Sequence, residues 1–436
     1  MKKFVKKTVT LVLLLSIVLC NTGCSLDKQP KEEAKRETVT LKLWHQWVLE
    51  TDSSTNSLKS AVKEWNDNNP DIQIQADGIN GEQYKTKIKT ALAAGEAPDI
   101  FYMWGGSFVY PYIKSGNILP LDIYLEDGIK NKLIPGSLES CVFDGKTYSL
   151  PMYTFIASLY CNEELFNKAG VGIPGTYDDL LSAVKTFRKK GITPVVIGEK
   201  DRWPGMYWFN ILAMRQAGNK ACLEAMKSPE LFGQQEFLEA AVKLDELVKA
   251  GAFNEDAFSM GFDEMLSEFK QGNAAMIYQG NWVDVHIEDS RAKTKGKVVA
   301  VPFPVIQGGK GNVSDFLGAN VDGYYININT KYRDEAVKVL KFISEKAGKE
   351  GYLNGAGIPC WKDEGIDDTM LSTLSKQSVK LMSTGTSFVG WWDTILPASD
   401  SEMHKSLVAE LLAGKKTPDE FISEMTKLKG SNNLAD

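Results

Sequence analysis

Tryptophan is the residue type whose number and placement in this sequence point most clearly to a binding chemistry. The chain of 436 residues contains ten tryptophans. An indole ring is a large, flat, apolar surface with one polar edge, and a pyranose presents a flat C–H face edged by hydroxyls, so rings outside the core would suit a sugar. The tryptophans that lie in Gly-, Pro- or polar-rich segments are Trp44, Trp47, Trp104, Trp203, Trp208, Trp282, Trp391 and Trp392.

Alternating strands and helices position the first of these rings. Expected strands and amphipathic helices alternate at 39–43, 58–65, 72–74, 84–92 and 99–103. This order predicts a doubly wound parallel sheet, in which ligands bind at the carboxyl ends of the strands. Trp104 directly follows the third strand and is therefore expected to be a platform at that edge. The loops to watch are 44–54, which contains Trp47, and 104–107.

The sequence does not favour a metal, redox or nucleic-acid site. Its three histidines, His45, His286 and His404, are far apart, and no two of the cysteines are spaced as CxxC. No cofactor or metal ligand is therefore expected. The formal net charge is -6, and this negative sign disfavours binding to nucleic acid.

The first residues predict export. Lysines precede an apolar run over 9–20 that is too short to cross a bilayer as a helix. We expect a lipoprotein signal peptide at 1–23, a lipidated Cys24, and a polar, disordered tether over 24–37. Asn21 replaces the leucine usual in a lipobox, and the alternative is an ordinary signal peptide that is cut nearby.

Five segments carry a resemblance to a known family. In their order and spacing they resemble the extracellular solute-binding proteins of carbohydrate ABC importers, the maltose-binding-protein-like group. The segments are WNDNNPDIQI, ALAAGEAPDIFYMWGGS, DGKTYSLPMYTFIASLYCNEELFNKAGV, FKQGNAAMIYQGNW and AELLAGKKTPDEF.

The resemblance implies an α/β, two-lobe, periplasmic-binding-protein-like fold with several hinge crossings and a sugar in the cleft between the lobes. It also implies a monomer, anchored by lipid outside the cell membrane, that delivers its ligand to two permease subunits and an ATPase. The first lobe would comprise 38–150 plus 284–330, and the second 151–283 plus 331–436. Crossings are expected near 150–151, 281–284 and 329.

The same resemblance adds candidate site residues to Trp104 and Trp47. Trp282 matches the stacking position after the GNW turn, and Trp203 is preferred over Trp208 in a loop that faces the cleft. Because neighbouring side chains point in different directions, one of Trp391 and Trp392 should serve the ligand, and we choose Trp392. The polar candidates are Asp52, Tyr153 and Asp322, with helix capping and hinge packing as alternative roles for the first two.

Two other functions stay open at this point. A secreted glycoside hydrolase would also be exported and rich in tryptophan, but it needs two carboxyl groups facing each other across the scissile bond. The adjacent pairs Glu163-Glu164 and Asp178-Asp179 look like solvated charges at helix starts. A solute-binding protein for a non-sugar ligand such as glycerol phosphate would need a basic cluster, and only Arg202 lies near a cleft loop. We therefore expect a binding protein and not an enzyme.

Overall fold

The computed structural model describes residues 38–50, 52–362 and 368–430. The predicted signal peptide, Cys24 and the tether lie outside the described residues. No helix in the described ranges is both long enough and apolar enough to span a bilayer.

Most of the strands belong to one mixed sheet. Its neighbours follow the order β2-β1-β3-β10-β6-β8-β7, and β9, β11 and β12 pair at its sides. β1, β2 and β3 are parallel, whereas β10 is antiparallel to β3 and β6. The strands are β1 (Val39–His45), β2 (Ile72–Gly78), β3 (Ile100–Met103), β4 (Val142–Phe143), β5 (Lys146–Thr147), β6 (Leu150–Asn162), β7 (Thr193–Val195), β8 (Ala274–Gly280), β9 (Val298–Val301), β10 (Asp315–Ile326), β11 (Ile358–Pro359) and β12 (Ser387–Val389).

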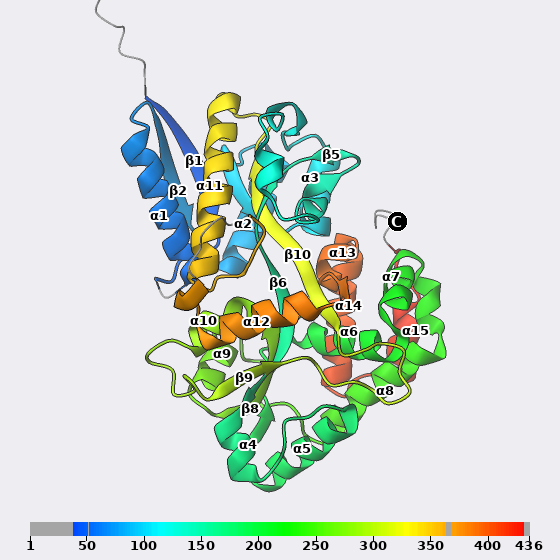
Figure 1. The fold of residues 1–436 in the computed structure, drawn as a ribbon. Helices are drawn as coiled ribbons and strands as arrows, with labels where there is room; N and C mark the ends of the chain where they lie inside the picture. The colour runs from blue at the N-terminus through cyan, green and yellow to red at the C-terminus, as the bar shows by residue number, and fades with distance from the viewer. Residues whose placement is uncertain (1–37, 51, 363–367, 431–436) are drawn as a thin grey trace, which may run out of the picture. The chain divides into compact units, whose positions relative to one another are not determined.

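Helices cover both faces of this sheet (Figure 1), as the predicted α/β class requires. They are α1 (Ser53–Asn68), α2 (Gly81–Ala94), α3 (Tyr110–Lys114), α4 (Glu163–Ala169), α5 (Tyr177–Lys189), α6 (Trp203–Ala217), α7 (Asn219–Lys227), α8 (Gln235–Lys249), α9 (Phe262–Lys270), α10 (Asp284–Ile287), α11 (Arg333–Leu353), α12 (Thr373–Thr384), α13 (Trp392–Ile395), α14 (Ala398–Leu412) and α15 (Pro418–Met425).

Local sequence explains several of these elements. The β1-α1-β2-α2-β3 succession is confirmed, with β1 paired in parallel to both β2 and β3. A capping box starts α5, because the Thr176 side chain and Asp179 satisfy each other's backbone amides, and the Thr-x-x-Asp spacing of these residues is typical of this motif. Gly95 ends α2 at a φ of 72°, in the left-handed region that favours glycine.

Two long strands run through the middle of the sheet and join its two ends (Figure 1). The first half of β6 pairs with β10, whereas its second half pairs with β8 and β9. Every residue of β6 is buried, as expected for a strand that is covered on both faces. The register of β10 against β6 shifts between Gly318 and Gly323, and Ala319 adopts a φ of 65°, so β10 is irregular where it passes from one end of the sheet to the other.

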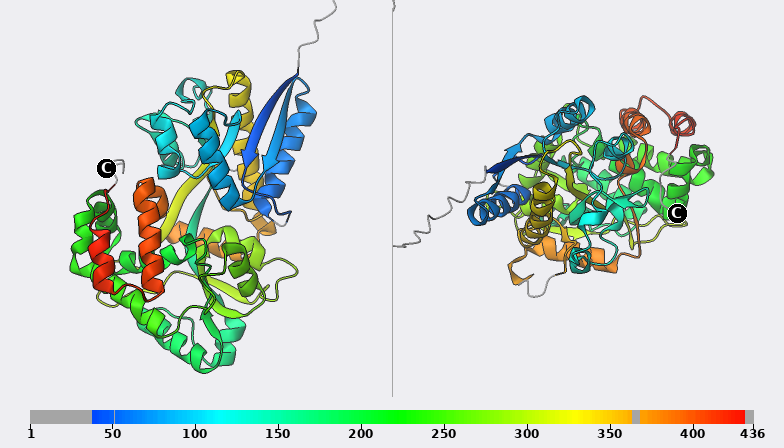
Figure 2. Two further views of the ribbon diagram at one scale, coloured as in Figure 1. Left: turned by 180° about the vertical axis from the view of Figure 1, so that it is seen from behind. Right: turned by 90° about the horizontal axis from the view of Figure 1, so that it is seen from above.

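Helix α11 lies beside α1 although almost 300 residues separate them in the chain. The elements are in contact, and the views from behind and from above both show them side by side (Figure 2). Lys346 of α11 forms ion pairs with Glu64 of α1 at 2.8 Å and with Glu350 at 3.1 Å. Helix α11 therefore packs against α1, and it also contacts β6 and β10, whereas the predicted lobe boundaries place residues 331–436 in the second lobe.

Candidate functional site

A cavity of about 600 Å³ collects most of the predicted site residues, and its volume is within the range of small-molecule sites. Segments that are far apart in the sequence line it, including the loop after β1, the end of β3, the start of α6 and the start of α9. The aromatic residues among its described lining are Trp47, Tyr102, Trp104, Phe108, Tyr153, Phe155, Trp203, Tyr207, Phe262, Trp282 and Trp391.

One group of rings comes from the carboxyl ends of β1 and β3. The ring centroids of Trp47 and Tyr102 are 4.7 Å apart, and those of Tyr102 and Trp104 are 5.2 Å apart. Trp104 also packs against Phe108, at 5.7 Å. Because β1 and β3 are parallel neighbours, their ends meet at one edge of the sheet, which is where Trp104 was expected.

A second group of rings comes from α6, the short turn Asn281–Val283 after β8, and the residue before α13. Trp282 lies at its centre, with its ring centroid 6.1 Å from Trp203 and 5.2 Å from Trp391. Tyr207 lies against Trp391 at 4.9 Å, with the two rings tilted by 31°. The ring of Trp282 lies over Gly280, where a side-chain Cβ would overlap it, so this turn needs glycine.

The structure places seven of the eight predicted ligand-binding residues around this cavity. They are Trp47, Asp52, Trp104, Tyr153, Trp203, Trp282 and Asp322. Trp208, the residue passed over in favour of Trp203, is fully buried in the core.

Trp392 is the exception, and its neighbour Trp391 takes the place in the cavity. The Trp392 side chain is 0% exposed and packs against Phe209, Phe232 and His404. Trp391 is the N-cap residue before α13, whereas Trp392 is the first residue of that helix. The two side chains therefore point in different directions, as expected, but the choice between them is reversed.

Asp52 caps helix α1 and also lines the cavity. Its carboxylate accepts a hydrogen bond from the Ser54 amide at 2.8 Å, so it fills the N-cap role that was its alternative assignment. Burial raises the pKa of Asp52, and the charge of Asp263 adds to that effect. The carboxylate can therefore cap the helix and still present an oxygen to a ligand.

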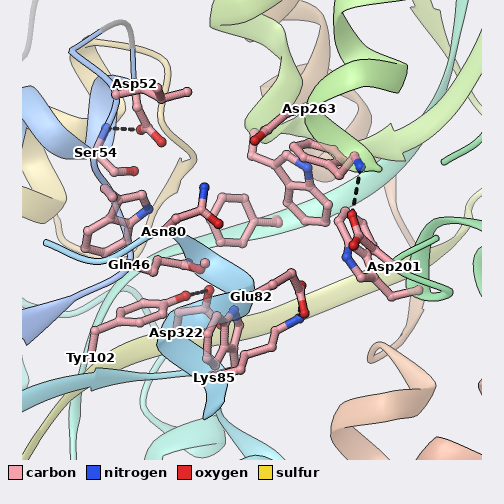
Figure 3. A pocket seen from close by; sticks show the side chains of 18 of the residues that line it. Gln46, Asp52, Ser54, Asn80, Glu82, Lys85, Tyr102, Asp201, Asp263 and Asp322 are labelled. Atoms are coloured by element: carbon pink, nitrogen blue, oxygen red, sulfur yellow. Dashed lines mark hydrogen bonds and ion pairs between the residues drawn. The ribbon is translucent and has the colours of Figure 1, made fainter. Parts of the chain in front are cut away.

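Asp322 lies deeper, beside Tyr102 (Figure 3). The Tyr102 hydroxyl donates a hydrogen bond to its carboxylate at 2.5 Å. Burial raises the pKa of Asp322 to about 7, opposed by the Tyr102 hydrogen bond and assisted by the charge of Asp393. A carboxyl group in this state can accept from, or donate to, a ligand hydroxyl.

Tyr153 links the crossing strand β6 to the start of α1. Its hydroxyl shares a 2.6 Å hydrogen bond with the Ser54 hydroxyl, and its ring packs edge-on against Phe155 at 5.4 Å. The side chain is 1% exposed, yet it borders the cavity. Both roles considered for Tyr153, packing at a crossing and contact with a ligand, are therefore compatible with its position.

Sequence reasoning missed several polar residues of the lining. Gln46, which follows β1, is one of them and points toward the centre of the close-up view (Figure 3). The residues not singled out at all include Asn80, Asp201, Asp263 and Asp393. Their available signals were weak: Asp263 stands in the first turn of a helix, and Asp393 follows two tryptophans. No group of three potential metal ligands occurs among the described residues.

Comparison with known proteins agrees with this geometry. The model of the family described as bacterial extracellular solute-binding protein matches residues 51–350. A solved structure from a study of xylan utilization by Caldanaerobius polysaccharolyticus is 38% identical, with a TM-score of 0.86, over 89% of this chain and 99% of the other. A chitin oligosaccharide binding protein is 26% identical, with a TM-score of 0.79, over 89% and 98% of the two chains.

Relatives with curated names point the same way. The melibiose/raffinose/stachyose-binding protein MelE of Bacillus subtilis is 23% identical over 69% of each chain. The structural likeness confirms the predicted two-lobe α/β fold. The chain therefore belongs to the family of bacterial extracellular solute-binding proteins.

Proposed function

We propose that the protein captures an oligosaccharide in the aromatic cavity and delivers it to the permease subunits of an ABC importer. The observation that carries this proposal is the convergence of five indole rings, Trp47, Trp104, Trp203, Trp282 and Trp391, from distant segments on one cavity. Carboxyl and amide groups stand between the rings, as the hydroxyl rim of a sugar requires.

The magnitudes are sufficient for tight binding. Covering about 50 Å² of apolar sugar face at about 25 cal/mol per Å² contributes about 1 kcal/mol for each ring. Hydrogen bonds from sugar hydroxyls to carboxylates such as Asp322 contribute about 1.5–3 kcal/mol each, before ordering costs. Three rings and a few such bonds reach the -8 kcal/mol or so of a micromolar complex.

Fragments of xylan are the first candidates for the ligand. The support is the 38% identity, over almost the whole described chain, to the structure studied for xylan utilization. Chitin fragments and raffinose-type sugars follow, from more distant relatives. Five indole rings line the cavity, and one pyranose has only two faces to cover, so the number of rings supports an oligosaccharide over a monosaccharide.

Closure of two lobes would couple capture to delivery. The proposed lobes keep the boundaries stated above, except that the packing of α11 on α1 supports assigning 333–353 to the first lobe. Trp104 then belongs to one lobe and Trp203 to the other, so a ligand touches both only when they approach. Binding shifts the population toward the closed form.

We further propose that the protein is a monomer, held at the outer face of the cell membrane by lipid on Cys24, and that it acts with two permeases and an ATPase. Relatives named as ABC transporter extracellular-binding proteins support the transport role. Metabolic labelling with an azide-bearing palmitate analogue tests the anchor. The native chain should incorporate the label, and the Cys24→Ser variant should not.

Calorimetric titration of the full chain, purified in a detergent without a sugar headgroup, tests the function. Xylotetraose, chitotetraose and raffinose form the panel, and we expect one to bind at a stoichiometry of one with a micromolar or lower Kd. Chromatography of the sugar after overnight incubation is the control for catalysis. Shortened products would support the glycoside hydrolase instead, and no binding by any of the three would contradict the proposal.

A further inference from the structure

The charged groups that line the cavity are mostly acidic. Only two lysines, Lys85 and Lys200, stand among its described lining residues. The carboxyl groups in the same lining are those of Asp52, Glu82, Asp201, Asp263, Glu264, Asp322 and Asp393.

Neither lysine offers a free, buried ammonium to an anionic ligand. The Lys85 ammonium is paired with Glu82 at 2.7 Å and lies 5.2 Å from the centre of the Trp104 ring. Lys200 is exposed, so solvent and salt screen its charge. His286 also borders the cavity, but burial lowers its pKa to about 4 and leaves it neutral at pH 7.

The acidic groups come from several separate elements around the cavity. Asp52 caps α1, whereas Asp263 lies in the first turn of α9, and Figure 3 shows them on different elements along one side of the view. They are close enough for the charge of Asp263 to raise the pKa of Asp52. Asp201 lies close to Asp263 as well. Its carboxylate accepts a hydrogen bond at 2.8 Å from the amide of Phe262, the residue before Asp263.

Asp322 and Asp393 are a second pair of neighbouring carboxyl groups in the lining. Asp393 is 8% exposed, and no other residue in the described part of the chain donates a hydrogen bond to its carboxylate. Its charge raises the pKa of Asp322. The nearest compensating charges are Lys85 and Lys405, and Lys405 is itself paired with Glu402 at 2.7 Å.

We propose that this lining is a charge filter, which admits uncharged oligosaccharides and rejects chains that carry a uronic acid. The inference rests on the proposed function and specifies its ligand class. A carboxylate on the ligand would meet carboxylates from several elements of the lining and would find no unpaired, buried ammonium among the described lining residues. Binding would remove water from the ligand carboxylate, and no cationic donor would take the place of that water.

Three matched sugars test the filter by calorimetric titration of the full chain at pH 8. They are xylotetraose, xylotetraose that carries one 4-O-methylglucuronic acid, and the methyl ester of that acid. We expect the acid to bind about 30-fold more weakly than its ester, which corresponds to about 2 kcal/mol. The ester has nearly the same shape without the charge, so it separates electrostatic rejection from steric exclusion.

Substitution of one lining carboxyl group tests whether the acidic lining causes the weaker binding of the acid. No described residue donates a hydrogen bond to the Asp263 carboxylate, so Asp263→Asn should fold normally. We expect it to lower the ratio of the acid and ester dissociation constants about 5-fold or more. Asp178→Asn, at an exposed position on α5, removes the same charge away from the cavity and should leave the ratio unchanged.

The outcomes are distinguishable. If xylotetraose binds and the acid binds as well as its ester, the charge filter is wrong and the proposed function stands. If the acid and the ester bind equally and both bind more weakly than xylotetraose, the charge filter is also wrong, because the size of the substituent and not its charge would explain the loss. If neither xylotetraose nor the ester binds, the proposed xylan ligand fails and the inference fails with it.

Discussion

Two matched substitutions, of Trp391 and of Trp392, can distinguish a residue that binds the ligand from a residue that stabilises the core. Trp392 is 0% exposed, with ring centroids 5.3 Å from His404 and 5.8 Å from both Phe209 and Phe232. Its replacement by alanine leaves an enclosed hole, and we expect the free energy of unfolding to fall by about 3–5 kcal/mol. No ligand contact is lost, so Kd should change less than about 2-fold.

Trp391→Ala should have the opposite profile. Trp391 borders the cavity and supports Tyr207 and Trp282, so the space left by its side chain opens into an existing solvent-filled cavity. The cost in stability should lie below that of Trp392→Ala. Loss of one apolar platform of about 50 Å² removes about 1 kcal/mol of binding, and displacement of Trp282 adds to it, so Kd should rise about 5-fold or more.

Urea unfolding followed by circular dichroism and calorimetric titration with the bound sugar measure the two quantities. Trp391→Phe is the control, because it keeps an aromatic face and should recover part of the lost affinity. A Trp392→Ala protein that folds with native stability but binds weakly would refute the assignment. So would a Trp391→Ala protein with unchanged Kd.

Three further substitutions test the packing that holds α6 in place. Burial raises the pKa of Glu199 from 4.5 to about 9, so the folded state binds this proton more tightly and stability should fall, by up to about 1.4 kcal/mol per pH unit, between those values. Urea unfolding at pH 6 and pH 8 should show this slope reduced in Glu199→Gln; an identical slope would contradict the assignment. A Cβ on residue 205 would overlap the Glu199 carboxylate, so Gly205→Ala should lower the melting temperature and cost about 2 kcal/mol or more, while Gly175→Ala, with open space around it, should be nearly neutral. Arg215 is fully buried and donates two hydrogen bonds to the Phe303 carbonyl, so Arg215→Met should cost about 2–4 kcal/mol in chemical unfolding, and a loss below about 0.5 kcal/mol would show that these bonds contribute little.

The local sequence was sufficient for the first part of the sheet and for the helix ends. Alternation and helical spacing report which face of a short segment is buried, and those signals act over a few residues. The β1-α1-β2-α2-β3 order and the capping box at Thr176 were therefore predictable. Trp104 was also predictable from its place directly after β3, because the ends of parallel strands meet at one edge.

Other features depended on the tertiary structure. The packing of α11 on α1 joins segments almost 300 residues apart, and no local pattern reports such a partner. The gathering of Asp52, Asp201 and Asp263 around the cavity required the starts of α1, α6 and α9 to converge, since each of these carboxylates alone looks like an ordinary residue near a helix start.

The pair Trp391 and Trp392 shows the physical limit most clearly. The sequence by itself determined that two adjacent rings must point in different directions, one to the ligand and one to the core. Which ring did which was decided by the start of α13 at Trp392, because the first helical residue turns its side chain toward Phe209 and Phe232. That direction depends on how α13 packs against α6 and the neighbouring helices, and packing is a property of the folded chain.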